Sequence, residues 1–323
     1  MAGKVMVVRL TEMVGLEVEL LALVREKRRV GGERALVLSV YDVSGEAEVE
    51  LMDKSRQDEV DEEIRQGDLV RILGRVGKLG DKVRVYATEI ERAPKEEAPP
   101  DHFLPSASRP REEMVSELRS LLSTIKEPHL RALCEEVFGD PEFLERFSIA
   151  PGAKMVHHAR LGGLLEHTLE VARMCEEVAR IYPELDRDLL LSAALLHDVG
   201  KVVEYSWDLR IERTDEGKLL GHVVLGAFIV AEKIRKVEGF PEDLRVRLLH
   251  CILAHMGKEE HGSPVRPMIP EAFVLYHVDH MLAHTSRSLE MVADLKKKGQ
   301  SWLSKRDWVL GSIIYAGKGE AER

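Results

Sequence analysis

Two different spacings of apolar residues divide the chain. Over the first 95 residues apolar and polar positions alternate, first at Val5 and Val7 and most clearly from Val18 to Val24. Alternation with a period of two is typical of strands that bury one face, and glycine-bearing turns separate the runs. About five strands of this length, with a short helix within residues 53–66, predict a small closed barrel of the oligonucleotide-binding (OB) type.

From residue 112 onward the apolar period becomes that of an α-helix, which predicts an all-helical second domain. The run between residues 93 and 111 contains five prolines and no apolar period, and is therefore a predicted linker. The resulting domains are an OB-fold domain over 1–95, a linker over 96–111 and a helical domain over 112–323. Helices are expected at 112–126, 129–138, 162–181, 187–199, 221–237, 241–255 and 269–295.

Net charge, cysteine content and the length of the longest apolar run indicate in which compartment the protein works and which partners it can bind. The 57 acidic residues outnumber the 47 lysines and arginines, giving a formal charge of −10, so any nucleic-acid contact must be local. Three widely spaced cysteines, set among apolar residues, indicate buried thiols in a reducing compartment. The longest apolar run, 189–196, is too short to span a membrane. These features predict a soluble cytoplasmic protein with no membrane partner, and a homo-oligomer is compatible with them.

The most informative segment is the apolar run 189–196, which ends at His197 and Asp198. A buried unpaired carboxylate costs several kcal/mol, so Asp198 needs a cationic partner. The adjacent His197 makes a metal ion a better candidate than Lys201 alone. The alternative interpretation is an exposed helix end with two ordinary polar residues.

Four further residues repeat this pattern, each a single metal-capable side chain on an otherwise apolar helix face: His167, His222, His255 and Asp279. Taken singly, each is better explained as a hydrogen-bonded core histidine or a buried capping carboxylate. Taken together, they predict a divalent metal centre, because histidine and carboxylate donors suit such ions. Mn²⁺ is the first candidate, with Fe²⁺, Mg²⁺ and Zn²⁺ as alternatives.

These residues carry a resemblance to known families. In order along the chain, His167, His197-Asp198 and Asp279 resemble the H…HD…D signature of the HD-domain metal-dependent phosphohydrolases. The stretches at 157–168, 182–190, 197–201, 221–222 and 262–264 are similar to those of the YhaM-type exoribonucleases. That family joins an amino-terminal OB fold to a carboxy-terminal HD domain, and the resemblance covers nearly the whole chain.

The resemblance implies a ligand set. One metal would be held by His167, His197, Asp198 and Asp279, and a second by His222 and His255 with Asp198 bridging. The chain departs from the family at Met256, where a second histidine is common, and at His280, which is a candidate substitute ligand.

The resemblance also implies a mechanism and substrate contacts. A divalent cation lowers the pKa of bound water, so hydrolysis needs no covalent nucleophile. Asp198 would be catalytic by holding the attacking hydroxide, and Lys201 by steadying a phosphate oxygen, although a lysine near a helix end is also explained by solvation alone. Arg160 and His158, just ahead of the Gly162-Gly163 turn, are secondary substrate contacts.

Basic residues of the predicted barrel gather near Gly31, including Arg34, and in the last hairpin. Arg28, Arg29, Arg75 and Lys82 are the predicted RNA contacts. A solvated charged surface is the alternative, because the barrel has few aromatic residues on which bases could stack.

The predicted function is therefore a metal-dependent 3′-5′ exoribonuclease that degrades single-stranded RNA, and as a second candidate single-stranded DNA, to nucleoside monophosphates. The polarity comes from the family alone. The first alternative is an HD phosphohydrolase acting on a small nucleotide or cyclic dinucleotide. The second is a catalytically silent nucleic-acid-binding protein, suggested by Met256. Trp302 and Trp308 are assigned no role beyond packing.

Overall fold

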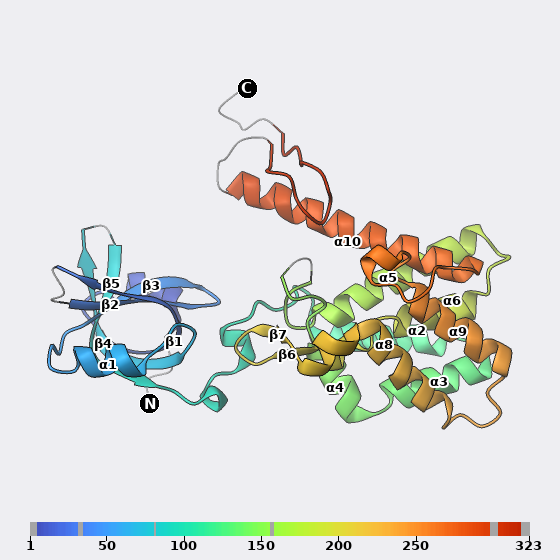
Figure 1. Cartoon of the computed structure of the whole chain (residues 1–323), viewed down its shortest axis with the longest axis horizontal. Helices are drawn as coiled ribbons and strands as arrows, with labels where there is room; N and C mark the ends of the chain where they lie inside the picture. The colour runs from blue at the N-terminus through green and yellow to red at the C-terminus, as the bar shows by residue number, and fades with distance from the viewer. Residues whose placement is uncertain (1–4, 32–34, 81, 156–157, 298–302, 318–323) are drawn as a thin grey trace. The chain divides into compact units, whose positions relative to one another are not determined.

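A computed structural model describes residues 5–31, 35–80, 82–155, 158–297 and 303–317. The chain forms two compact units (Figure 1). The first comprises residues 1–105 with 208–210, and the second comprises residues 106–207 and 211–323. The predicted linker is thus divided between the units, and Phe103 and Leu104 within it are buried. Arg34, His157 and Trp302 lie outside the described residues.

In the described part of the first unit, five strands close into a barrel with the order β1-β2-β3-β5-β4. They are β1 (Glu17–Val30), β2 (Ala35–Asp42), β3 (Gly45–Leu51), β4 (Leu69–Leu79) and β5 (Lys82–Arg92), and α1 (Gln57–Glu63) lies between β3 and β4 in sequence. Neighbouring strands are antiparallel except for the parallel pair β3–β5. Closure leaves no unpaired sheet edge. The predicted OB-like barrel and its short helix are confirmed.

The alternating residues of β1 fill the barrel, where Leu20, Ala22 and Val24 are fully buried. The expected strand around Val5 and Val7 is wrong, because Val7 begins the 3₁₀ helix η1 (Val7–Glu12). Its apolar residues Val7 and Leu10 belong to the barrel core. The Val7 amide donates to Asp42 Oδ2 at 2.7 Å, a side-chain acceptor that replaces a strand partner.

The second unit is helical, as predicted, with a two-stranded hairpin added. Its helices are α2 (Arg111–Ser123), α3 (Pro128–Phe138), α4 (Pro141–Ile149), α5 (Gly163–Ile181), α6 (Arg187–Leu196), α7 (Lys201–Glu204), α8 (Asp215–Ile234), α9 (Glu242–Ala254) and α10 (Pro270–Lys297). The hairpin pairs β6 (Tyr205–Trp207) with β7 (Ile211–Arg213), and a 3₁₀ turn occurs at η4 (Glu259–His261). The 3₁₀ turns η2 (Lys95–Glu97) and η3 (Pro100–His102) belong to the first unit. No helix in the described part of the chain is long and apolar enough to cross a membrane.

Helix α6 forms the centre of the helical core. Every residue from Leu189 to Leu196 is buried, and α6 contacts α3, α5, α9 and α10. A helix that is apolar on all sides can only be accommodated in this way. Its last turn therefore delivers His197 and Asp198 to the interior of the bundle.

Two glycines shape the approach of α8 to this end of α6. Gly221, with φ 72° and ψ 156°, kinks α8 immediately before His222, which explains why the sequence predicted a helix start there. Gly200 lies directly against α8, and a Cβ at this position would overlap the His222 carbonyl oxygen. Gly200 thus allows the backbone that carries His222 to pack against the end of α6.

The three cysteines are packing residues of the helical unit. Cys134, Cys175 and Cys251 are buried free thiols. Burial raises the pKa of the Cys134 thiol to about 12, so this thiol stays protonated and unreactive.

Candidate metal centre

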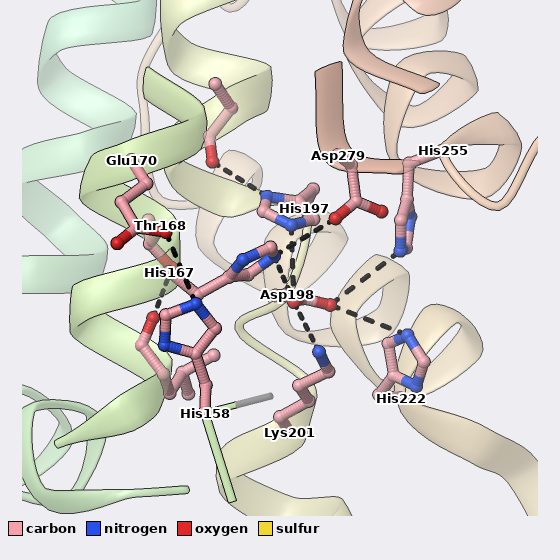
Figure 2. Close-up of polar contacts among 12 residues, drawn as sticks. His158, His167, Thr168, Glu170, His197, Asp198, Lys201, His222, His255 and Asp279 are labelled. Atoms are coloured by element: carbon pink, nitrogen blue, oxygen red, sulfur yellow. Dashed lines mark hydrogen bonds and ion pairs between the residues drawn. The ribbon is translucent and has the colours of Figure 1, made fainter. Parts of the chain in front are cut away.

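The structure brings all six predicted metal-binding residues together (Figure 2). His167 comes from α5, and His197 and Asp198 follow the last turn of α6. His222 follows the kink of α8, His255 caps the carboxyl end of α9, and Asp279 lies on α10. Residues separated by more than a hundred positions in the sequence thus surround one carboxylate, that of Asp198.

Asp198 directs its two oxygens at two different pairs of histidines. Its Oδ2 lies 3.2 Å from Nε2 of His197 and 3.5 Å from Nε2 of His167. Its Oδ1 lies 3.5 Å from Nε2 of His222 and 3.7 Å from Nε2 of His255. A carboxylate placed in this way can bridge two cations, one on each side.

The donor atoms fall into two groups on these two sides. The ligand atoms of His167, His197 and Asp279 lie within 4.8 Å of one another, and so do those of Asp198, His222 and His255. His167 Nε2 is 3.1 Å from Asp279 Oδ1. This division matches the two ligand sets that the resemblance implies.

Several of these atoms are buried without a hydrogen bond, which tests whether they fit a metal. Among the described residues, His197 Nε2, Asp198 Oδ1 and His222 Nε2 have no hydrogen-bond partner. Leaving a buried polar atom unsatisfied costs about 1–3 kcal/mol. A divalent cation bound between these lone pairs would remove that cost, so the residues present fit a metal centre.

The ring nitrogens that point away from the centre fix the orientation of three histidines. Nδ1 of His197 donates to the Ala194 carbonyl at 2.8 Å, and Nδ1 of His255 donates to the Ile252 carbonyl at 2.7 Å. Nδ1 of His222 lies 3.1 Å from Glu204 Oε2. Because Nδ1 carries the proton in the first two rings, their Nε2 lone pairs face Asp198, as metal ligation requires.

Sequence analysis missed Glu204. It is 1% exposed, on the short helix α7, and it pairs with His222 through Oε2 and with Arg213 through Oε1 at 3.3 Å, so it can orient His222. A single glutamate near the end of a helix usually lies on the surface. The sequence signal that could have found it is its place three residues after Lys201, in the turn that follows the His-Asp pair.

The electrostatics of the site keep its carboxylates ionised. Burial alone would raise the pKa of Asp198, but Lys201, with Nζ 2.6 Å from Oδ2, and His197 hold that pKa well below its usual range. His167 likewise lowers the pKa of Asp279 against the effect of burial. Burial lowers the pKa of His255 to about 4, and nearby His197 adds to this effect. Ionised carboxylates and a neutral His255 are the forms that bind metals.

The two predicted substrate contacts beside α5 interact with acidic residues of that helix. Arg160 donates to Glu166 Oε2 through Nε at 3.0 Å and Nη2 at 2.6 Å. His158 is 3.2 Å from the same oxygen and 3.3 Å from Glu170 Oε2. His158 adopts a left-handed φ of 63° and lines the cavity at the metal centre. Glu166 is therefore a positioning residue that the sequence did not reveal.

The predicted contacts on the barrel differ in their surroundings. Arg28 forms an ion pair with Glu48, and Arg29 pairs with Asp58 at 2.7 Å and Asp61 at 3.0 Å. Arg75 on β4 and Lys82 at the start of β5 are exposed, and within the described ranges neither forms an ion pair. Acidic neighbours thus offset Arg28 and Arg29. Arg75 and Lys82 are more available for an anionic ligand, although Lys82 is close enough to Glu48 to help lower the pKa of that carboxyl.

Comparison with known proteins agrees with the geometry. Residues 164–284 match the model of the HD domain, so the fold and site define a protein with an OB-like barrel and an HD domain. The 3′-5′ exoribonuclease YhaM of Bacillus licheniformis is 31% identical over 286 residues, covering 86% of this chain and 90% of that protein. The YhaM proteins of Bacillus subtilis and Geobacillus sp. are 31% and 32% identical, covering 81% of this chain each and 83% and 80% of their own lengths. The chain belongs to the YhaM family.

Proposed function

We propose that this protein is a metal-dependent 3′-5′ exoribonuclease that hydrolyses single-stranded RNA to nucleoside monophosphates. Membership of a family whose relatives are named 3′-5′ exoribonucleases supports the activity and its polarity. The observation that carries the chemistry is Asp198, whose two oxygens face two separate groups of metal-capable side chains.

The proposed ligands follow from this arrangement. His167, His197, Asp198 and Asp279 hold one ion, and Asp198, His222 and His255 hold the other. Bound divalent cations supply Lewis acidity, which offsets charge on phosphoryl oxygens and lowers the pKa of water. We propose Mn²⁺ as the ion, with Fe²⁺, Mg²⁺ and Zn²⁺ as alternatives, because mixed imidazole and carboxylate donors suit such metals. His280 is in neither group of donor atoms among the described residues, so we do not include it.

The chain's own residues position the substrate. Lys201 lines the cavity, and the neighbouring Asp198 raises its pKa although burial alone would lower it, so its ammonium group stays charged. That charge can bind a non-bridging phosphate oxygen. Glu204 keeps His222 turned toward Asp198, and Glu166 holds Arg160 and His158 beside the cavity. Among the described lining residues there is no serine, threonine or cysteine, which favours direct attack by water.

The barrel is proposed to deliver the strand. Arg75 and Lys82 provide exposed positive charge, and Arg28 and Arg29 contribute less because acidic residues already pair with them. Binding of this kind is weak, salt-sensitive and tolerant of sequence. Single-stranded DNA is a second proposed substrate. The three buried free thiols fit the proposed cytoplasmic location.

The test is a denaturing-gel time course with Mn²⁺ and 5′-labelled single-stranded RNA, with Asp198→Ala and a chelator as controls. We expect a ladder that shortens from the 3′ end and is absent in both controls. Intact RNA would overturn the proposal. Degradation by Asp198→Ala at the parent rate would overturn the metal assignment.

A further inference from the structure

Trp308 lines the metal-centre cavity, although no sequence pattern predicted this position. The cavity has a volume of about 440 Å³, and Trp308 lines it together with Asp198 and Lys201. This volume falls within the range of small-ligand sites, about 300–1,000 Å³. Trp308 is 74% exposed, so its indole is accessible to a ligand that enters the cavity.

The turn that carries Trp308 is fixed to α10. Asp307 is 6% exposed, and its Oδ2 accepts from Nη2 of Arg287 at 2.7 Å and from Nε at 3.1 Å. Its Oδ1 accepts from the backbone amides of Val309 and Leu310, each at 3.0 Å. The buried Asp307 therefore anchors the backbone turn that carries Trp308, so that the position of this residue beside the cavity is set before any ligand binds.

Other rings on and near α10 extend this surface. His280 and His284 have ring centroids 4.0 Å apart, and His261 stacks on His280 at 5.7 Å with an interplanar angle of 15°. Tyr276 lies 5.7 Å from His280. All four rings line the same cavity as Trp308. The cavity thus combines the metal-capable residues and Lys201 with a set of aromatic and imidazole rings.

These two chemistries correspond to the two parts of a nucleotide. The metal-capable residues and Lys201 suit a phosphodiester, whereas flat rings suit the face of a nucleobase. We propose that Trp308, supported by the rings of His280 and His284, binds a base next to the scissile phosphate by stacking. This inference rests on the proposed exoribonuclease function and identifies a nucleobase as the part of the substrate that Trp308 contacts.

The proposal also accounts for strand selectivity at the site itself. Every base presents a π-face, so stacking on Trp308 tolerates any sequence. A base inside a duplex is already stacked on both sides and must leave the helix before it can contact the indole, at a cost of a few kcal/mol. The ring surface therefore favours single strands irrespective of what the barrel binds.

The test compares oligoribonucleotides that differ by a single base. One substrate is complete, one carries a base-free 1-deoxyribose residue at the 3′ terminus, and one carries it at the penultimate position. For the parent enzyme we expect kcat/KM to be lower on at least one base-free substrate than on complete RNA. In Trp308→Ala that preference should shrink about fivefold or more, and in Trp308→Phe it should persist.

Two controls separate stacking from structure. Ile313→Ala removes another exposed apolar side chain of the same segment, one that is not among the cavity-lining residues, and should keep the parent preference. Arg287→Gln loosens the Trp308 turn and should reduce the preference without changing the ring. An equal loss by Trp308→Ala on all three substrates would indicate a structural role and overturn the proposal.

Failure of this inference is distinguishable from failure of the proposed function. If the parent shortens RNA and Trp308→Ala keeps the full preference for complete substrates, the base-binding role is wrong and the exoribonuclease function stands. If the parent does not shorten RNA in an Asp198-dependent manner, the proposed function is wrong, and this inference is overturned with it.

Discussion

Lys201 Nζ lies 2.6 Å from Asp198 Oδ2, the same oxygen that faces His197 and His167. Lys201 therefore lies on the side of the Asp198 carboxylate that faces His197 and His167, two members of the first group of donor residues. A fixed ammonium charge opposes a metal cation at this position but attracts the phosphate of a substrate.

Replacing this charge should separate the two effects. In Lys201→Met, metal affinity measured by calorimetry should be unchanged or higher, because a competing cation is gone. The rate of RNA hydrolysis at saturating Mn²⁺ should fall about a hundredfold, as for the loss of one preorganised donor to a developing charge. A fall in metal affinity with an unchanged rate would contradict the assignment of Lys201 to the phosphate.

Glu204 should act through His222. Glu204→Gln removes the carboxylate 3.1 Å from His222 Nδ1, and loss of such an outer-shell partner typically weakens metal binding about 10–100-fold. We expect activity to fall at limiting Mn²⁺ and to recover at excess Mn²⁺. The control is Glu216→Gln, an exposed glutamate on α8. A loss that excess metal does not restore would indicate a structural effect only.

Gly200 should be intolerant of a single methyl group. Gly200→Ala places a Cβ against the His222 carbonyl oxygen and 2.5 Å from the Gly226 amide nitrogen, so α8 and His222 must move. We expect a loss of stability of about 1–3 kcal/mol in urea unfolding, and loss of activity. At Gly226 the nearest atom to a Cβ is 3.3 Å away, so Gly226→Ala should be milder. Equal stability of both variants would refute the close packing.

Glu166 should make stability depend on pH. Although burial opposes it, His158 and Arg160 lower the pKa of Glu166 to about 2. A carboxylate with a depressed native pKa stabilises the fold above its unfolded value of about 4.5, and this contribution is lost as pH falls toward 2. Glu166→Gln should therefore be less stable than the parent at pH 7, on the order of 3 kcal/mol, with a smaller gap at pH 3.5. Urea unfolding at both pH values checks this, and a gap that widens on acidification would contradict it.

The exposed cations of the barrel should determine the salt dependence of RNA binding. In the double variant Arg75→Gln, Lys82→Gln the slope of log affinity against log salt should decrease by about 1.4, since each phosphate contact contributes about 0.7 for single strands. Fluorescence anisotropy with labelled RNA measures the slope. Arg28→Gln, which removes an already paired charge, should change the slope less. Hydrolysis of a nitrophenyl phosphodiester should be unaffected in all these variants.

The sequence predicted the architecture well because both domains obey simple periodicities. Alternating residues such as Leu20 and Val24 do fill a closed barrel, and the expected helices agree with α5, α6 and α9 to within a few residues. The expected helix at 221 proved to be the second half of α8, because a kink at Gly221 resets the helical phase. Helix α4 was missed because it is short and preceded by the Asp140-Pro141 turn signal.

The candidate site was predictable only in part. Histidines and aspartates on apolar helix faces are anomalous in a sequence, so His167 and Asp279 could be selected. Glu166 and Trp308 could not, because a single glutamate or tryptophan is unremarkable in a sequence, and Glu204 had only its place three residues after Lys201 to indicate it. What distinguishes them is position in three dimensions: Glu204 is 1% exposed beside His222, whereas Trp308 is 74% exposed beside a cavity.

The order of the donor residues along the chain has a consequence for protein synthesis. The first of them, His167, leaves the ribosome 112 residues before the last, Asp279, which lies on α10. Until α10 has emerged and docked, a nascent chain lacks part of the donor set for the first ion. A nascent chain that does not yet contain α10 should therefore lack the Asp279 carboxylate of the proposed first metal site and should not yet degrade RNA.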